Sequence, residues 1–214
     1  MKHVISLILI LILPLNNLYS QSDNIEIYNE MFKWNFSISS YFENVSPKED
    51  EKSPANGKEI IGNQIRQEII NKSIKIYEFK SGEFNQLSAN YQPIKSEENY
   101  SERFKQIVEI SYESLYESSL KKFPKAEITR SHSIEIISNI TFVVFDMNIS
   151  SNNLKMNFKY FNAIINGKIL SIQVQYQDVE KGQTMISAFR KSTFKKYLIL
   201  LASILRNGKI YTEI

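Results

Sequence analysis

The sequence has no cysteine in its 214 residues, and it is also poor in glycine, proline, histidine and tryptophan. Without cysteine the chain has no disulfide, no thiolate metal ligand, no C-x-x-C redox pair and no cysteine nucleophile. Its 6 glycines form neither a G-x-G-x-x-G fingerprint nor a phosphate-binding loop. We therefore expect neither a bound metal nor a cofactor.

Histidine is scarce as well, because His132 is the only one after residue 20. It stands between Ser131 and Ser133 in an alternating stretch, where neighbouring side chains point to opposite faces of a strand. Neither serine is therefore placed to use His132 as a base. The few aspartates form no calcium loop and no catalytic pair. We expect no catalytic activity, and an enzyme that uses His132 with nearby carboxylates is the weaker alternative.

Long hydrophobic runs are also few, and the first of them is too short to cross a membrane. Residues 4–13 are apolar, and they are preceded by Lys2 and followed by Pro14. This run is about half the ~20 residues that a membrane-spanning helix needs. The arrangement is typical of a secretory signal peptide over residues 1–20, cleaved after Ser20. We expect a periplasmic or secreted chain with no transmembrane segment after cleavage.

The rest of the chain is expected to form one domain over residues 21–194, with an extension over 195–214 packed on it. The extension contains an apolar run at 197–205. As a helix, this run would span less than half of a ~30 Å hydrocarbon core. A buried helix, a contact with a second subunit and a helix on a membrane surface stay open. Because the run is apolar nearly all round, burial is favoured.

The charge pattern adds little about partners. The formal net charge is +3, with acidic residues more frequent before residue 103 and basic residues after it. Such a distribution is ordinary for the solvated surface of a folded domain, and a basic partner-binding face is the alternative. No nucleic-acid motif is present, so we expect another exported protein, and not a nucleic acid, as the partner.

Alternation of apolar and polar residues is the strongest signal that the chain does have, and it runs through residues 126–176. Four successive alternating segments predict an antiparallel meander. Asn166-Gly167, before the last segment, suits a two-residue turn with positive φ at both positions. The apolar phase changes between Tyr160 and Phe161, which predicts a β-bulge at that point.

A long helix is predicted over residues 97–122, because apolar residues recur there at spacings of three, four and seven. Ser96 suits the N-cap, and Pro124 follows the basic end. The last strand of the meander presents an apolar face over residues 170–176. Since both apolar surfaces need a partner, we expect this helix to pack across that face.

The first half of the chain gives weaker signals. An aromatic strand over residues 32–38 predicts a buried Trp34, with a partner-binding tryptophan as the alternative. The polar stretch 43–57 is expected to be a surface loop and the first place to look for a partner contact. Residues 58–70 predict a short helix, and 74–91 predict a hairpin.

Near the C-terminus, residues 177–182 are expected to form a polar turn, followed by a short helix over 184–191. The complete order of elements then resembles the exported PsbP-like and DcrB-like proteins. The resemblance rests on the aromatic strand, the hairpin, the long helix, the final hairpin Asn166-Gly167-Lys168-Ile169-Leu170-Ser171-Ile172 and the closing Ser192-Thr193-Phe194. It covers roughly residues 32–194.

The resemblance implies an α+β fold, an α-β-α sandwich with a central antiparallel sheet, in a family of mostly non-enzymatic accessory or binding proteins. It transfers no catalytic, cofactor-binding or metal residue to this chain. We therefore expect an exported, non-catalytic binding or accessory protein. A periplasmic immunity protein or a chaperone-like protein that binds a toxin or effector is the alternative.

Overall fold

The computed structural model describes residues 23–47, 73–94, 100–152 and 154–195. The predicted signal peptide, the short helix over 58–70, the N-cap Ser96 and the C-terminal run at 197–205 lie outside the described residues. Most of the predicted polar loop, from residue 48 onward, lies outside them too.

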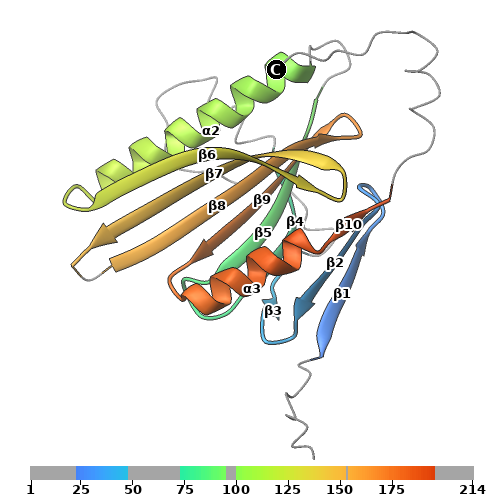
Figure 1. Cartoon of the computed structure of the whole chain (residues 1–214), viewed down its shortest axis with the longest axis horizontal. Helices are drawn as coiled ribbons and strands as arrows, with labels where there is room; N and C mark the ends of the chain where they lie inside the picture. The colour runs from blue at the N-terminus through green and yellow to red at the C-terminus, as the bar shows by residue number, and fades with distance from the viewer. Residues whose placement is uncertain (1–22, 48–72, 95–99, 153, 196–214) are drawn as a thin grey trace, which may run out of the picture.

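The described chain forms two antiparallel sheets and two helices (Figure 1). The larger sheet has seven strands in the order β3-β4-β5-β9-β8-β7-β6, and the smaller has three in the order β1-β2-β10. The smaller sheet comprises β1 (Asn24–Asn29), β2 (Trp34–Ser39) and β10 (Thr193–Phe194). The larger comprises β3 (Glu43–Asn44), β4 (Ile74–Lys80), β5 (Gln86–Pro93), β6 (Glu127–Ile137), β7 (Ile140–Ser151), β8 (Leu154–Ile165) and β9 (Lys168–Tyr176). The helices are α2 (Tyr100–Lys122) and α3 (Val179–Arg190).

The large sheet is the middle layer of a sandwich. Helix α2 covers one face, while α3 and the small sheet lie together on the other (Figure 1). This is the predicted α+β, α-β-α architecture. The polar loop expected from residue 43 begins later than predicted, because Glu43–Asn44 form β3 at the edge of the large sheet.

The predicted meander is confirmed by strands β6 to β9, each paired with the next. Asn166 and Gly167 have φ values of 53° and 68° in the final turn. Both values are positive, as a type I′ turn requires. The hairpin predicted over 74–91 is also confirmed, by β4 and β5.

The β-bulge predicted in the third meander strand is wrong, because the pairing of β8 continues without a shift through Tyr160 and Phe161. The apolar phase changes because β8 is covered on different faces along its length. Met156 and Phe158 face the α2 layer, whereas Phe161 faces the layer of α3 and the small sheet. A strand whose first and second halves are buried on opposite faces produces the same change of apolar phase in the sequence as a bulge.

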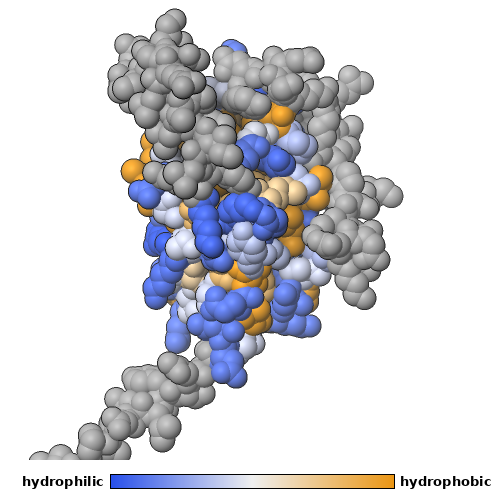
Figure 2. Space-filling model, turned by 90° about the vertical axis from the view of Figure 1, so that its right-hand side faces the viewer, coloured by the Kyte–Doolittle hydropathy of each residue, from blue (hydrophilic) through white to orange (hydrophobic). Residues whose placement is uncertain are grey.

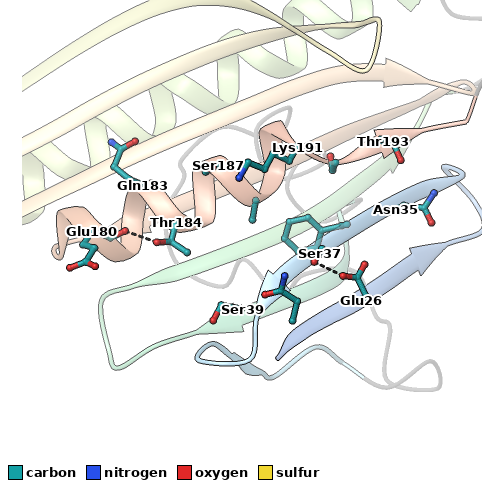
Figure 3. Close-up of a pocket in the computed structure, with 14 residues that line it drawn as sticks. Glu26, Asn35, Ser37, Ser39, Glu180, Gln183, Thr184, Ser187, Lys191 and Thr193 are labelled. Atoms are coloured by element: carbon teal, nitrogen blue, oxygen red, sulfur yellow. Dashed lines mark hydrogen bonds between the residues drawn. The ribbon is translucent and has the colours of Figure 1, made fainter. Parts of the chain in front are cut away.

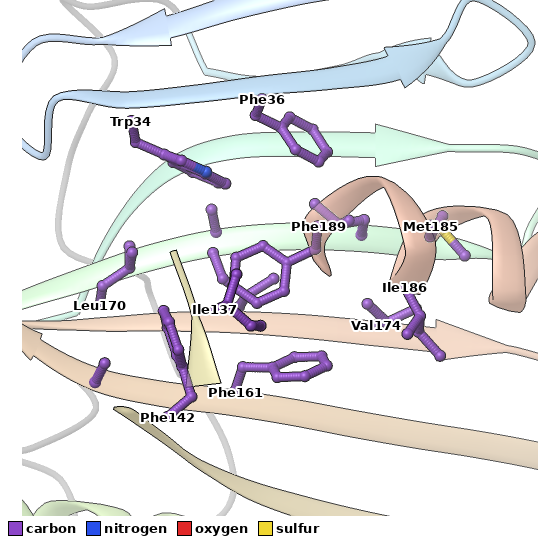
Figure 4. Close-up of a cluster of buried hydrophobic side chains, with 14 of the residues drawn as sticks. Trp34, Phe36, Ile137, Phe142, Phe161, Leu170, Val174, Met185, Ile186 and Phe189 are labelled. Carbon is purple, nitrogen blue, oxygen red and sulfur yellow. The ribbon is translucent and has the colours of Figure 1, made fainter. Parts of the chain in front are cut away.

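The predicted facing of the long helix is also wrong. Leu170, Ile172 and Val174 of β9 face away from α2 and pack in the core with Trp34 and Phe189 (Figure 4). Helix α2 packs on the other face, where its buried residues Val108 and Tyr112 contact a second cluster. That cluster is supplied mainly by Phe145, Met147, Ile149, Met156 and Phe158. The helix therefore covers the face of β7 and β8 that is opposite to the face covered by α3 and the small sheet.

Trp34 is a core residue with 0% of its surface exposed, as predicted. Its ring stacks on Phe194 at 5.7 Å between centroids and meets Phe189 edge-on at 6.1 Å. These contacts join β2, β10 and α3 into one covering layer. The partner-binding alternative for Trp34 is wrong, because no surface of the ring is available.

Helix α3 begins at Val179, within the stretch expected to be a polar turn. Asp178 is its N-cap, and its carboxylate accepts hydrogen bonds from the backbone N–H groups of Glu180 and Lys181 at 3.0 and 3.2 Å. This cap satisfies amides that would otherwise lack partners in the first turn. The polar residues that suggested a turn are therefore the first turn of the helix.

Candidate functional site

A groove runs along the seam between α3 and the small sheet (Figure 3). Its volume is about 680 Å³. One side is formed by polar side chains of β1 and β2, and the other by the outward face of α3 and the residues that follow it. The lining residues are Asn24, Glu26, Asn35, Phe36, Ser37, Ser39, Glu180, Gln183, Thr184, Ser187, Ala188, Lys191, Ser192 and Thr193.

The groove exists because β10 is much shorter than the strand beside it. β10 pairs with β2 only at Trp34 and Asn35. On the opposite side, β1 pairs with the whole of β2. Beyond Asn35, the side of β2 that faces α3 is therefore paired with no strand among the described residues.

The backbone of Ser37 faces this open side. Residues of an antiparallel strand direct their N–H and C=O groups alternately to the two neighbouring strands. The C=O of Lys33 accepts a bond from the N–H of Lys195 at 2.9 Å, on the β10 side. The N–H of Ser40 bonds to Asp23, on the β1 side. Ser37, an even number of residues from Lys33, therefore directs its backbone groups into the groove.

Neutral hydrogen-bonding groups dominate the lining. The Ser37 hydroxyl donates to the Glu26 carboxylate at 2.5 Å, and the Thr184 hydroxyl donates to the C=O of Glu180 at 2.9 Å (Figure 3). Figure 2 shows the end of the molecule that lies at the right of Figure 1, where hydrophobic residues form narrow strips between hydrophilic ones. A groove lined by such hydrogen-bonding groups is better suited to bind a polypeptide backbone than to bind a broad apolar surface of a partner protein.

His132 does not assemble a catalytic group in the described part of the chain. It is exposed on β6, and its ring lies 5.0 Å from the ring of Phe145 and 5.6 Å from that of Tyr112. Next to it on the same face, Arg130 is bound to Glu113 at 2.6 Å and lies over Tyr116. No described carboxylate forms a hydrogen bond or ion pair with the His132 ring.

Charged groups elsewhere form structural ion pairs. Arg190 of α3 donates two bonds to the Glu135 carboxylate of β6, at 2.7 and 2.8 Å. These bonds hold the pKa of Glu135 below its usual range, against the opposing effect of partial burial, and Lys159 acts in the same direction. Lys159 is itself bound to Asp146 at 2.8 Å. Within the described ranges, no three histidine, aspartate or glutamate side chains gather closely enough to hold a metal ion.

No motif in the sequence pointed directly to the groove. Its two sides come from the first strands and from the last helix, and neither contains a motif that links it to the other. The only indication of the groove in the sequence was that the last alternating segment ends early, at Phe194.

Among the described helices, none is long and apolar enough to cross a membrane.

Comparison with known proteins identifies the fold. No family model matches the sequence. No curated protein matches it either. The structure is similar to the solution structure of cyanobacterial PsbP (CyanoP) from Synechocystis sp. PCC 6803, with a TM-score of 0.52 and 7% sequence identity. The similarity covers 81% of this chain and 94% of that chain. The chain therefore has a PsbP-like fold.

Proposed function

We propose that this chain is an exported, non-catalytic binding or accessory protein whose partner is another exported protein. The partner is bound through an extended segment that lies in the groove between β2 and α3. The observation that carries this proposal is the early end of β10, which leaves the backbone of Ser37 directed into a 680 Å³ groove. A strand edge beside a helix is a common way to hold an extended peptide, because the edge supplies backbone bonds and the helix supplies side-chain contacts.

Export rests on residues 1–20, whose apolar run and flanking residues are typical of a signal peptide. Fractionation of the native cells and N-terminal sequencing test this part directly. We expect the protein in the periplasm or the medium, beginning at Gln21. An uncleaved protein in the cytoplasm would contradict export.

Binding is tested with Ser37→Pro in the processed protein. Proline removes one N–H from the side of β2 that faces the groove, and it leaves the pairing with β1 intact. We expect the wild-type protein to capture a defined partner from its own periplasm and Ser37→Pro to lose it, with little change in melting temperature. Ser37→Ala is the matched control, because it keeps the backbone N–H and should retain the partner.

A second variant approaches the groove from the helix. Thr184 is exposed and lines the groove, so Thr184→Trp should fill it without entering the core. We expect this variant to lose the same partner. Capture of that partner by both Ser37→Pro and Thr184→Trp at the wild-type level would reject the groove as the binding site.

The partner's identity separates an accessory protein from the immunity or chaperone alternative, since a toxin or effector would be recovered in that case. His132→Ala tests the enzymatic alternative. We expect a stable protein with unchanged function, because His132 is exposed and no described carboxylate is bonded to its ring. A selective loss of function in a stable His132→Ala protein would favour the enzyme.

A further inference from the structure

A second hollow lies on the opposite face of the large sheet, between α2 and strands β5, β8 and β9. Its volume is about 340 Å³, which is within the usual range of small-molecule sites. No residue of this cavity lines the groove between β2 and α3. The two hollows are therefore separate, and binding in this cavity does not depend on the proposed function of the groove.

The floor of the cavity is polar, although it lies beside a helix that packs on the same face. A sheet surface under a helix is usually apolar, because burial of apolar area holds the layers together. Here two rows of polar side chains cross three neighbouring strands in register. The rows are Asn90–Ser171–Asn162 and Ser88–Gln173–Tyr160.

Several of these polar groups belong to largely buried residues and have no hydrogen-bond partner among the described residues. Ser88 is 3% exposed and Gln92 is 6% exposed. No described residue forms a hydrogen bond with the Ser88 hydroxyl, the Gln92 side-chain amide or the Tyr160 hydroxyl. A polar group of this kind needs a hydrogen-bond partner, either water or a ligand, to offset the loss of its hydration. All three residues line the cavity, so a ligand there can satisfy them.

A hydrogen-bonded chain presents a further donor. The Ser171 hydroxyl donates to Asn162 Oδ1 at 2.6 Å, and Asn162 Nδ2 donates to Tyr112 Oη at 2.6 Å. Because the Tyr112 oxygen accepts this bond, its own proton remains available to the cavity. Burial raises the pKa of Tyr112 well above its usual range, so the phenol keeps that proton.

The cavity carries no free charge among its described residues. Lys75 is the one charged side chain in the lining, and its Nζ is bound to Glu78 at 2.6 Å. Apolar contact comes from Ile107 and Leu115 of α2 and from Ile169 of β9. A charged ligand would lose its hydration without finding a counter-charge. A ligand with many hydroxyl groups and apolar C–H faces matches both kinds of lining.

We propose that the cavity beneath α2 binds a small neutral polyhydroxylated ligand, a mono- or disaccharide. The polar rows bond to its hydroxyl groups, and the tyrosine rings and aliphatic side chains contact its C–H faces. Tyr160 and Ser88 contribute bonds that the folded protein does not otherwise use.

The test is calorimetric titration of the processed protein with neutral hexoses and their disaccharides. Glucose 6-phosphate and glucuronate serve as charged counterparts of the same ring. We expect at least one neutral sugar to bind and to raise the melting temperature with concentration. We expect the charged counterparts to bind far more weakly, because the described lining offers them no free cation.

The decisive variants are Tyr160→Phe and Ser88→Ala, which remove hydroxyl groups without protein partners. Each should weaken sugar binding roughly three- to tenfold. Neither should lower the melting temperature of the unliganded protein, because no bond of the folded state is lost. Tyr176→Phe is the matched control, because Tyr176 does not line the cavity.

Two outcomes overturn the proposal. One is that no neutral sugar binds, in which case the cavity holds only water. The other is that a sugar binds but its affinity is the same in Tyr160→Phe and Ser88→Ala, which would place the sugar elsewhere.

Discussion

At the scale of single residues, Gly182 lies in the first turns of α3, where the ring of Tyr176 crosses the helix. A Cβ atom at this position would lie 2.3 Å from two carbons of that ring. No contact of this length is tolerated, so either the ring or the helix must move. Gly182 thus sets how closely α3 approaches the end of β9.

We predict that Gly182→Ala destabilises the protein by about 1–3 kcal/mol, the usual cost of overpacking, despite the better helix propensity of alanine. Urea denaturation measures the change. Gln183→Ala, at the next and exposed position of the helix, is the control and should have little effect. An unchanged or higher midpoint for Gly182→Ala would show that the ring moves aside at no cost.

Residue patterns in the sequence were sufficient to predict those features whose physical cause lies in neighbouring residues. The turn at Asn166-Gly167 follows from the preference of these two residues for positive φ, and the burial of Trp34 follows from the alternation around it. The start of α3 was missed because Asp178 and Gly182 also suit a turn. Only the contact of Gly182 with Tyr176, which involves the folded chain, distinguishes the two.

At the scale of elements, the two covering layers pack on separate apolar clusters. Phe189 of α3 belongs to the cluster that contains Trp34, whereas Val108 of α2 belongs to the cluster around Phe145 and Met147. The middle sheet lies between them. Trp34, the only tryptophan of the chain, therefore reports on the α3 layer alone.

We predict that Phe189→Ala costs about 3–5 kcal/mol and shifts the emission of Trp34 to longer wavelength, since the substitution opens a cavity beside the indole. Val108→Asp should destabilise the protein by placing a charge beneath α2. Any folded fraction of Val108→Asp should keep the native Trp34 emission. An equal spectral shift in both variants would mean that the two layers loosen together.

The Arg190–Glu135 pair ties α3 to the edge strand β6, and its contribution depends on pH. The pKa of Glu135 is lowered in the folded protein, so the pair stabilises the fold above the ordinary carboxyl pKa of 4.5. That contribution is lost as the pH falls through the lower, folded-state pKa. Arg190 is 45% exposed, so the contribution is about 1 kcal/mol or less.

We predict that Arg190→Met reduces the loss of stability between neutral and acid pH. Chemical denaturation of both proteins at several pH values measures this difference. Lys191→Met, at the neighbouring basic residue, is the control and should keep the wild-type pH dependence. Parallel pH profiles for wild type and Arg190→Met would show that the pair adds no net stability.

At the scale of the whole molecule, the sequence predicted the layers but not their assignment. Alternation and helical spacing identify which stretches have an apolar face, and the meander follows from them directly. They do not say which of two layers covers a given face, because the large sheet carries an apolar cluster on each of its faces. The groove and the cavity could not be predicted from the sequence, for a related reason. Each is lined by segments that only the tertiary fold brings together.

Among the described residues, β6 forms a long sheet edge. Strand β6 pairs with β7 along all of its 11 residues without a bulge, and Ile134 and Ile136 are 66% and 73% exposed. It contains neither lysine nor proline, which commonly prevent edge-to-edge association. This edge is therefore the region of the described surface most prone to self-association.

We predict that Ile136→Lys lowers aggregation in concentrated solution and changes the melting temperature little, because the side chain is already exposed. Light scattering during storage and on heating measures the effect. Val179→Lys, at another exposed apolar residue away from this edge, is the control and should aggregate like the wild type. Equal aggregation of Ile136→Lys and wild type would mean that association begins elsewhere.

The stacking of Trp34 on Phe194 also determines when the protein can fold. The packing around Trp34 is completed only after α3 and β10 have been synthesised, because the same cluster contains Phe189 and Phe194. Contacts so distant along the chain form slowly. A nascent chain therefore lacks the ring contacts of Trp34 with Phe189 and Phe194 until residue 194 has been synthesised. The layer of α3 and the small sheet is therefore the late-forming part of the described fold, and the first aromatic strand waits for it with part of its apolar surface uncovered.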